Sequence, residues 1–213
     1  MSGAIDDGAT VAARLAALPG AQRYPGRQLD LFVVRGFLDG DRCAALCRLI
    51  DQRKRPSEIA DDRGDPKFRT SETCDLDNAE PLVAALDAQL NAALGIEAER
   101  GEPMQGQRYA PEQEFKPHTD TFNPGGADYY AFCADQGQRT WTAMLYLNQP
   151  EAGGATRFKA IDKAIQPETG KLLAWNNLLP DGSPNPATLH QGMKVRAGAK
   201  YIITKWYREF PAR

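Results

Sequence analysis

Three residues of the chain have the types and the spacing of metal ligands. One residue separates His118 from Asp120, and His190, the only other histidine, follows much later. His118 and Asp120 end a β-like segment, where alternate side chains project to the same face, so both can reach one ion. A facing strand that carried His190 would complete the set. The spacing therefore predicts a site for a divalent metal.

Two imidazoles and one carboxylate on one face of an octahedron leave three coordination positions open. This facial triad holds iron(II) in non-haem oxygenases, where the open positions accept a cosubstrate and dioxygen. A histidine and an aspartate one residue apart are a weak signal by themselves. The alternative is that His118 is a hydrogen-bonded or surface histidine and Asp120 a turn residue. Residues outside these three must decide between a metal site and this alternative.

Lys200 is one such residue. It falls on the predicted strand that follows the one presenting His190. A lysine buried at the closed end of a barrel is costly without an anionic partner. 2-Oxoglutarate would provide the partner, because its 1-carboxylate and 2-oxo group can chelate iron while its 5-carboxylate pairs with Lys200. The alternative is a solvated strand lysine, which is our prediction for the nearby Lys205.

The elements that must position these residues begin with a strand and two helices. A β-branched and aromatic run at residues 29–37 predicts a strand. Asp39 or Asp41 is placed to cap the helix that follows it. Pro81 begins a second helix, which ends before Gly95. The first half of the chain is therefore predicted to be mainly helical.

A polar segment lies between the two helices, and short β-like runs make up the second half of the chain. Residues 54–75 are polar and predict a long surface loop between the helices. After Gly101 short β-like runs alternate with clusters of Gly, Pro, Asn and Asp, which is typical of a sandwich or barrel. The runs are 104–109, 139–148, 156–158, 171–175 and 201–207.

The domain plan that follows is of the α+β class. Residues 1–28 are predicted to be a polar lead-in with one short helix at 11–18. Residues 29–213 are predicted to form a single domain, in which helices within 39–95 support a β-core at about 101–210. The length of 213 residues suits one such domain with a sizeable core.

Composition and net charge limit the classes of partner that we expect the protein to bind. Hydrophobic residues make up 42% and charged residues 25%, with a formal net charge of -2. A nucleic-acid-binding domain is usually basic, so we expect no nucleic acid as partner. No stretch approaches the roughly 20 apolar residues that span a bilayer, so we expect no membrane. Asp6 and Asp7 stand where a signal peptide carries basic residues, which predicts a cytoplasmic protein with reduced thiols.

Several motifs, in order, resemble the prolyl 4-hydroxylase branch of the 2-oxoglutarate/iron(II) dioxygenases. The matching segments are Tyr109, His118-x-Asp120, 137–140, 142–148, 153–158, and His190 with Lys200 and Trp206. The resemblance implies a double-stranded β-helix, or jelly roll, with N-terminal helices packed on one sheet. Ala155 replaces the family's usual Glu, and Met193-Lys194-Val195 stands where Pro-Val is common. These departures concern the site entrance, and neither touches a presumed ligand.

The resemblance also implies roles for residues around the triad. Lys200 and Tyr109 are expected to bind 2-oxoglutarate. The expected substrate-binding residues are Arg139, Arg69, Ser71 and Trp206. For both arginines the alternative is a surface charge or a structural ion pair.

The activity implied by the resemblance is hydroxylation of a C–H bond, coupled to oxidative decarboxylation of 2-oxoglutarate. The cofactor would be Fe²⁺, with 2-oxoglutarate and O2 as cosubstrates and with L-ascorbate as an accessory. A prolyl residue in a peptide or protein is the expected target. One alternative is a hydroxylase of a free amino acid or another small molecule. The other is a catalytically inactive jelly-roll binding protein. Asp120 favours hydroxylation, since halogenating relatives lack this carboxylate.

Overall fold

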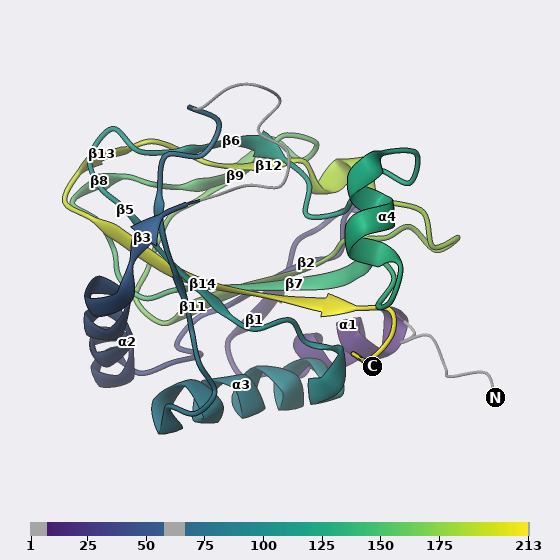
Figure 1. Ribbon diagram of the computed structural model, residues 1–213, viewed down its shortest axis with the longest axis horizontal. Coiled ribbons are helices and arrows are strands. Elements are labelled where there is room, and N and C mark those ends of the chain that lie inside the picture. The colour runs from purple at the N-terminus through teal and green to yellow at the C-terminus, as the bar shows by residue number, and fades with distance from the viewer. Residues whose placement is uncertain (1–7, 58–66, 213) are drawn as a thin grey trace.

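Two antiparallel sheets face each other in the computed structural model, which describes residues 8–57 and 67–212 (Figure 1). The larger sheet has eight strands, which are, in spatial order, β1 (Ala21–Arg23), β2 (Leu31–Val34), β11 (Lys171–Asn176), β7 (Arg139–Tyr146), β14 (Lys200–Arg208), β5 (Gln105–Tyr109), β4 (Glu72–Asp75) and β3 (Arg55–Pro56). The smaller sheet consists of β10 (Lys163–Ile165), β9 (Thr156–Phe158), β12 (His190–Gly192) and β6 (Phe115–His118). A separate pair is formed by β13 (Val195–Ala197) and β8 (Ala152–Gly153).

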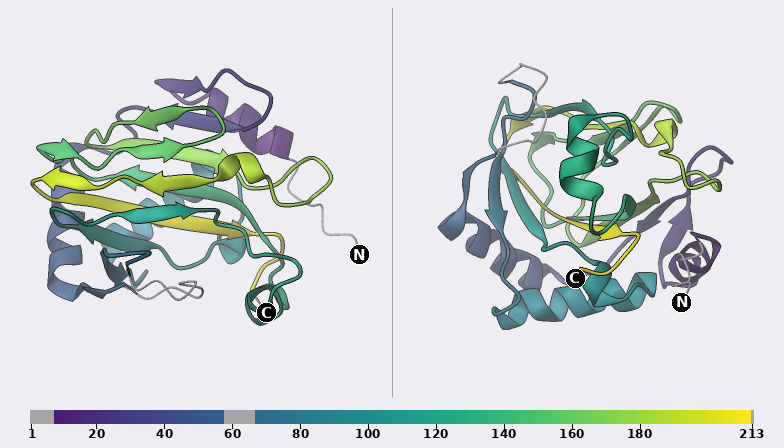
Figure 2. Two further views of the ribbon diagram at one scale, coloured as in Figure 1. Left: turned by 90° about the horizontal axis from the view of Figure 1, so that it is seen from above. Right: turned by 45° about the vertical axis from the view of Figure 1, so that its right-hand side comes forward.

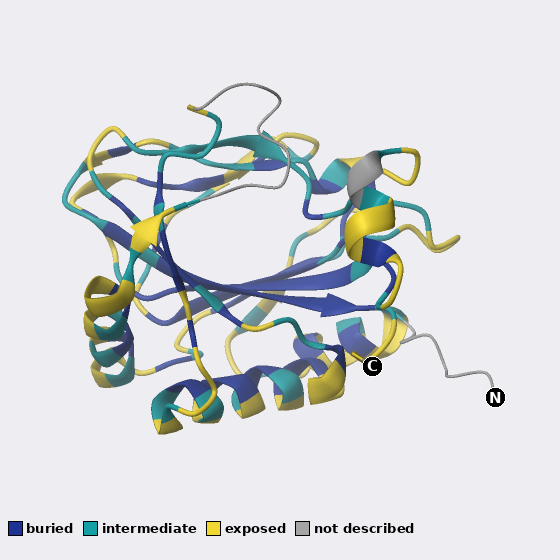
Figure 3. Cartoon of the chain, in the orientation of Figure 1, coloured by how far each residue is buried: buried dark blue, intermediate teal, exposed yellow. Residues whose placement is uncertain are grey.

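Helices cover the outer face of the larger sheet. The described helices are α1 (Gly8–Ala16), α2 (Gly40–Arg53), α3 (Pro81–Leu94) and α4 (Ala127–Cys133), with short 3-10 turns at Ala98–Arg100 and Pro186–Thr188. α1, α2 and α3 pack on one side of the sheet, and their sheet-facing sides are buried (Figure 3). α4 lies across one end of the interior around which the two sheets curl (Figure 2). Within the described residues, no helix is long and apolar enough to cross a membrane.

Strand alternation divides the core into two layers, as the two faces of a pleated strand require. On β7, Met144 and Tyr146 point between the sheets and pack with Phe158 of the smaller sheet. Ala143 and Leu145, which alternate with them, face the helices. The predicted jelly roll with N-terminal helices packed on one sheet is confirmed by this arrangement.

The two predicted helices begin where the sequence indicates, and the second also ends there. Asp39 caps α2, because its side chain accepts a hydrogen bond from the backbone N–H of Arg42 at 2.9 Å. Pro81 occupies the first position of α3, where its missing N–H costs nothing. Gly95 ends that helix with a φ of 74°, a conformation that glycine adopts without strain.

The prediction of a surface loop over residues 54–75 is wrong at the two ends of this segment. β3 and β4 pair within the larger sheet, and Thr73 and Cys74 of β4 are buried. The polar composition of this segment hid the strand, since its polar side chains are satisfied by one another. Ser57, for example, hydrogen-bonds Ser71 at 2.9 Å. The middle of the predicted loop, residues 58–66, lies outside the described residues.

The predicted lead-in at residues 1–28 is integrated into the domain where it is described. β1 pairs with β2 at the edge of the larger sheet. Val11 and Leu15 of α1 are buried in the core layer between sheet and helices. Residues 1–7 lie outside the described part. The sequence pattern predicted neither the short strand β1 nor the helix α4.

Lys205 was predicted to be solvated, and the structure buries it. It forms an ion pair with Asp87 of α3, and the lysine side chain is only 2% exposed. Asn91 donates to the same carboxylate at 2.8 Å and accepts from the hydroxyl of Tyr207 at 2.9 Å. The outward face of β14 is therefore joined to α3 by a buried polar network. The prediction failed because Asp87 is far from Lys205 in sequence.

This network gives a test of how α3 is held. We expect Asp87→Ala to lower the free energy of unfolding by about 3–5 kcal/mol, because it leaves the buried Lys205 charge without its partner. Glu80→Ala is the matched control at the N-cap of the same helix, because it removes an exposed ion pair with Arg53 and no capping hydrogen bond. Its cost should stay below about 1 kcal/mol. Urea denaturation followed by circular dichroism measures both, and equal losses would contradict the assignment.

Candidate metal centre

The pairing of two short strands brings the three predicted ligands together. β12 runs antiparallel to β6, and His190 lies directly opposite His118. Asp120 follows two residues after His118, so its carboxylate turns back toward the same point. The potential ligand atoms of the three residues all lie within 4.8 Å of one another. His118 Nε2 is 4.0 Å from Asp120 Oδ1.

Backbone carbonyl groups orient both imidazole rings. His118 Nδ1 lies 2.8 Å from the carbonyl oxygen of Lys116, and His190 Nδ1 lies 2.9 Å from that of Thr188. A carbonyl oxygen only accepts, so each Nδ1 carries the proton. The Nε2 lone pairs are then free to bind a metal, which is the usual second-sphere arrangement of ligating histidines.

The electrostatics of the site favour the protonation states that a metal needs. Burial, followed by the proximity of the His190 imidazole, lowers the pKa of His118 to about 3. Its imidazole is therefore neutral at neutral pH. Burial opposes ionisation of Asp120, but His190, His118 and Arg139 together hold the pKa of this carboxyl below its usual value. Neutral imidazole and ionised carboxylate are the ligand forms of divalent metals.

Aromatic rings enclose the two histidines. Phe115 stacks on His118, with ring centroids 3.6 Å apart and an interplanar angle of 17°. Trp175 and Phe158 pack against His190, with centroids at 4.9 Å and 5.4 Å. These contacts restrict the ring orientations and make the surroundings apolar, which strengthens electrostatic interactions at the site.

Lys200 lies on the inner face of β14 as a buried amine, to which the described residues offer no anionic partner. It is 1% exposed and stands opposite Tyr109 of β5 in the strand register. Its Nζ is 5.1 Å from the ring centroid of Tyr109 and 5.5 Å from that of Tyr146. Burial lowers the pKa of Lys200 to about 7. Within residues 8–57 and 67–212, no carboxylate forms an ion pair with it, so its position suits a ligand that brings one.

Tyr109 is the second residue expected to bind 2-oxoglutarate. It is buried, and its hydroxyl donates to Gln107 Oε1 at 3.0 Å. Burial raises the pKa of the phenol, so it remains a neutral hydrogen-bonding group. The structure brings Tyr109 next to Lys200, and its contact with the cosubstrate stays a prediction.

Arg69 and Ser71 lie on the chain segment that leads into β4. Arg69 donates to Ser71 Oγ at 3.1 Å and to Thr73 Oγ1 at 3.0 Å. Its guanidinium carbon is 5.0 Å from the ring centroid of Phe115, the ring that stacks on His118. Among the described residues its partners are hydroxyl groups and this ring, and no carboxylate pairs with it. Arg69 therefore brings a positive charge close to the triad, with no carboxylate from the described residues to neutralise it.

Arg139 forms an ion pair with Glu102, a residue that the sequence pattern did not identify. Its Nε and Nη2 donate to the two carboxylate oxygens of Glu102, both at 2.7 Å, and its guanidinium lies 4.0 Å from the ring centroid of Trp206. Nη1 approaches the backbone oxygen of Asp120 at 3.4 Å. The geometry matches the alternative of a structural ion pair, and contacts of Arg139 and Trp206 with substrate stay predictions.

Two further polar residues beside the triad were missed. Thr142 and Asn177 are completely buried, and Thr142 hydrogen-bonds the carboxylate of Asp120 at 2.7 Å. A signal for Thr142 did exist, since a threonine at an inward position of an otherwise apolar strand needs a polar partner. Glu102 and Asn177 left no comparable signal in the sequence.

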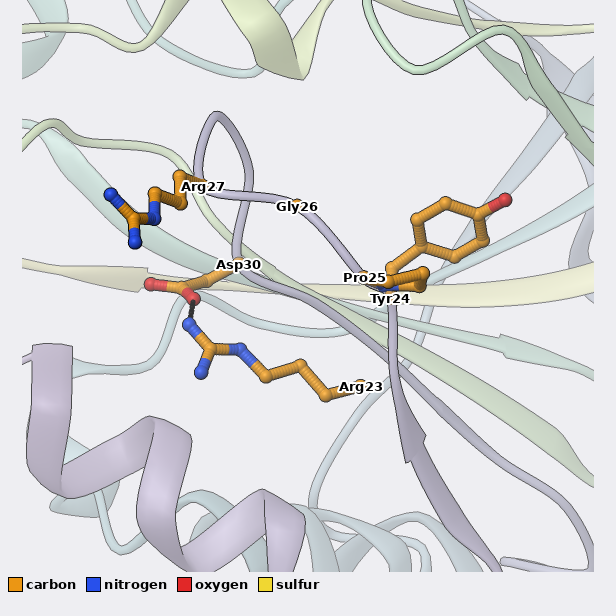
Figure 4. Close-up of a pocket in the computed structure, with 6 residues that line it drawn as sticks. All are labelled: Arg23, Tyr24, Pro25, Gly26, Arg27 and Asp30. Carbon is orange, nitrogen blue, oxygen red and sulfur yellow. Dashed lines mark hydrogen bonds and ion pairs between the residues drawn. The ribbon is translucent and has the colours of Figure 1, made fainter.

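A shallow pocket on the turn between β1 and β2 is a separate feature (Figure 4). The residues that line it are Arg23, Tyr24, Pro25, Gly26, Arg27 and Asp30. Arg23 forms an ion pair with Asp30, so part of the positive charge is already neutralised. The pocket contains none of the predicted site residues.

Comparisons of sequence agree with this geometry. The sequence profile of the 2OG-Fe(II) oxygenase superfamily matches residues 104–208. A putative prolyl 4-hydroxylase of Acanthamoeba polyphaga mimivirus is 25% identical over 179 residues, which cover 84% of this chain and 74% of the relative. Prolyl 4-hydroxylase 1 of Arabidopsis thaliana is 28% identical over 199 residues, which cover 84% of this chain and 69% of the relative.

A solved structure shares the fold. The viral collagen prolyl hydroxylase of Paramecium Bursaria Chlorella virus-1, in its 2OG complex, superposes with a TM-score of 0.67 at 25% identity. The superposition covers 86% of this chain and 97% of the viral protein. His118, Asp120 and His190 offer the donor atoms that the metal site of such an enzyme requires. The chain thus belongs to the 2OG-Fe(II) oxygenase superfamily, as a prolyl 4-hydroxylase-like dioxygenase that uses iron(II), 2-oxoglutarate and dioxygen.

Proposed function

We propose that this dioxygenase hydroxylates a prolyl residue in a peptide or protein, with iron(II) held by His118, Asp120 and His190. The observation that carries the proposal is the buried triad, whose ligand atoms lie within 4.8 Å of one another. The names of the relatives support prolyl substrates, since those proteins are called prolyl 4-hydroxylases. The viral neighbour, a collagen prolyl hydroxylase, supports a peptide chain as the substrate.

Each residue of the site has a separate task in this mechanism. Iron, when bound, supplies the oxidising power for decarboxylation and for C–H cleavage. His118 stays neutral, and both histidines bond a carbonyl oxygen through Nδ1 and leave Nε2 for the metal. Lys200 pairs with the distal carboxylate of 2-oxoglutarate and fixes its orientation, with the hydroxyl of Tyr109 as the neighbouring polar group. The aromatic rings around the histidines exclude water.

The substrate-binding part of the proposal rests on polar groups beside the triad. Arg69 has hydrogen-bond partners but no carboxylate partner among the described residues, so its guanidinium can also donate to peptide carbonyl oxygens. Ser71 orients that guanidinium. Trp206 keeps a buried indole N–H without a hydrogen-bond partner in the described structure. Arg139 completes the proposed set through its stacking on Trp206.

Two further points belong to the proposal. The four cysteines are free thiols, which agrees with a cytoplasmic location. Ascorbate would act as an accessory reductant that keeps iron in its divalent form. Recovery of activity on adding ascorbate to an exhausted reaction would support this accessory role, and its absence would remove ascorbate from the proposal.

The metal assignment predicts the effect of removing one ligand. His118→Ala should lower substrate-dependent succinate release by roughly 100-fold or more, beyond the 10–100-fold typical of second-sphere losses. The measurement pairs succinate release with iron content and with the thermal unfolding midpoint. Glu80→Ala is the control on the helical side of the molecule, since it removes an exposed ion pair with Arg53. Undiminished succinate release by folded His118→Ala would overturn the assignment.

The substrate class is tested separately with proline-rich peptides and free proline. We expect succinate release and a mass gain of one oxygen atom with the peptides only. Hydroxylation of free proline alone would favour the small-molecule alternative. Failure of both, in a protein that binds iron and 2-oxoglutarate, would favour the inactive binding protein.

Lys200 predicts the pH dependence of cosubstrate binding. Its pKa of about 7 in the free protein should rise when a carboxylate pairs with it, so binding takes up a proton above pH 7. The dissociation constant of 2-oxoglutarate should therefore increase from pH 7 to pH 9, by at most about tenfold per pH unit. Calorimetry in buffers of different ionisation enthalpy measures the affinity and the proton uptake together.

The matched variants for this experiment are Lys200→Met and Lys200→Arg. The methionine variant should bind 2-oxoglutarate roughly 100-fold more weakly and lose the pH dependence, because the charge-assisted pair is gone. The arginine variant retains a charge throughout this range and should bind without proton uptake. Unchanged affinity in the methionine variant would rule out Lys200 as the anchor, whereas an affinity of the unmodified protein that stays constant from pH 7 to pH 9 would contradict the lowered pKa.

A further inference from the structure

The two carboxylate oxygens of Asp120 have different surroundings. Oδ1 faces the triad, 4.0 Å from His118 Nε2. Oδ2 accepts a hydrogen bond from Thr142 Oγ1 at 2.7 Å. Asp120 is 7% exposed and Thr142 is completely buried, so water does not compete with this bond. One oxygen is therefore directed at the metal position and the other is held by the protein.

A third residue fixes the direction of this hydrogen bond. Asn177 Nδ2 donates to Thr142 Oγ1 at 2.8 Å. An ionised carboxylate only accepts, so the single hydroxyl proton of Thr142 must go to Asp120. The hydroxyl oxygen can then accept only from the amide NH2 of Asn177, which determines the orientation of that amide. The chain of donation runs from Asn177 through Thr142 to Asp120.

The backbone holds both ends of this chain in place. Thr142 occupies an inward position in the middle of the larger sheet, on β7, between β11 and β14. Asn177 follows β11, and its backbone N–H donates to the carbonyl oxygen of Thr140 at 2.7 Å. Its own carbonyl oxygen accepts from the N–H of Asn185 at 2.8 Å. The backbones of Thr142 and Asn177 are therefore both fixed relative to the sheet.

We propose that Thr142, oriented by Asn177, is a positioning residue that keeps Asp120 a one-oxygen metal ligand. A carboxylate with both oxygens free can bind through both and occupy a position that the cosubstrate or dioxygen needs. The bond from Thr142 withdraws Oδ2 from the metal and leaves Oδ1 as the ligand. This inference rests on the metal site proposed above, and it adds a role for two residues outside the triad.

Cobalt(II) is a suitable probe, because it occupies iron sites and its visible spectrum reports coordination number. Thr142→Val preserves the shape of the side chain and removes the hydroxyl. We expect it to lower cobalt(II) affinity by about 10–100-fold, as losses of second-sphere partners do, and to change the spectrum. Thr142→Ser retains the hydroxyl and should restore both toward the unmodified protein. Titrations are performed under nitrogen and require no turnover.

Thr140→Val is the matched control. Thr140 lies two residues earlier on the same strand, is also buried, and its hydroxyl donates to the carbonyl oxygen of Tyr207 at 3.2 Å. Its loss should lower the thermal unfolding midpoint and leave cobalt(II) affinity unchanged. A purely structural role for Thr142 would give the same result as this control.

A double-mutant cycle tests the part played by Asn177. If Asn177 acts only through Thr142, Asn177→Ala should lower cobalt(II) affinity on its own but have no further effect in the Thr142→Val background. Fully additive losses would overturn the relay, and so would unchanged affinity in Thr142→Val. Absence of cobalt(II) binding by the unmodified protein would instead overturn the metal site itself. The two failures are therefore distinguishable.

Discussion

The antiparallel pairing of β6 with β12 is the constraint on which the site depends. It places His118 opposite His190, although the two residues are far apart in the sequence. β12 also pairs with β9, so the register of His190 is fixed from both sides. A shift of one residue would turn a histidine to the other face of the sheet. Asp120 needs no strand of its own, because it reaches the same point from the turn after β6.

Strand β14 shows how one residue type can serve two purposes within a few residues. Lys200 faces the interior between the sheets, where the described residues offer no carboxylate for it. Lys205 faces the helices and is neutralised by Asp87. Both are buried, and alternation along the strand assigns them to opposite layers. The first remains available for a ligand's charge, whereas the second stabilises the attachment of α3.

The sequence was informative where function depends on a few residue types in a fixed order, and less so where long-range partners decide. The triad, Lys200 and the two capped helices could be predicted because spacing, charge burial and caps are local signals. β4 could not, since its polar residues satisfy one another only after it joins the sheet. The burial of Lys205 and the pairing of Arg139 with Glu102 depend on partners that only the fold brings near.

The meeting of both histidines at one point has a practical consequence. The sequence contains only these two imidazoles. Isotopic labelling of histidine would therefore give nuclear magnetic resonance signals that arise at the triad alone, without background from elsewhere in the chain. Nδ1 of each ring bonds to a carbonyl oxygen, so the two ring protons should exchange slowly and report on the centre individually. The chain carries its own spectroscopic reporter, placed where a metal would be sensed directly.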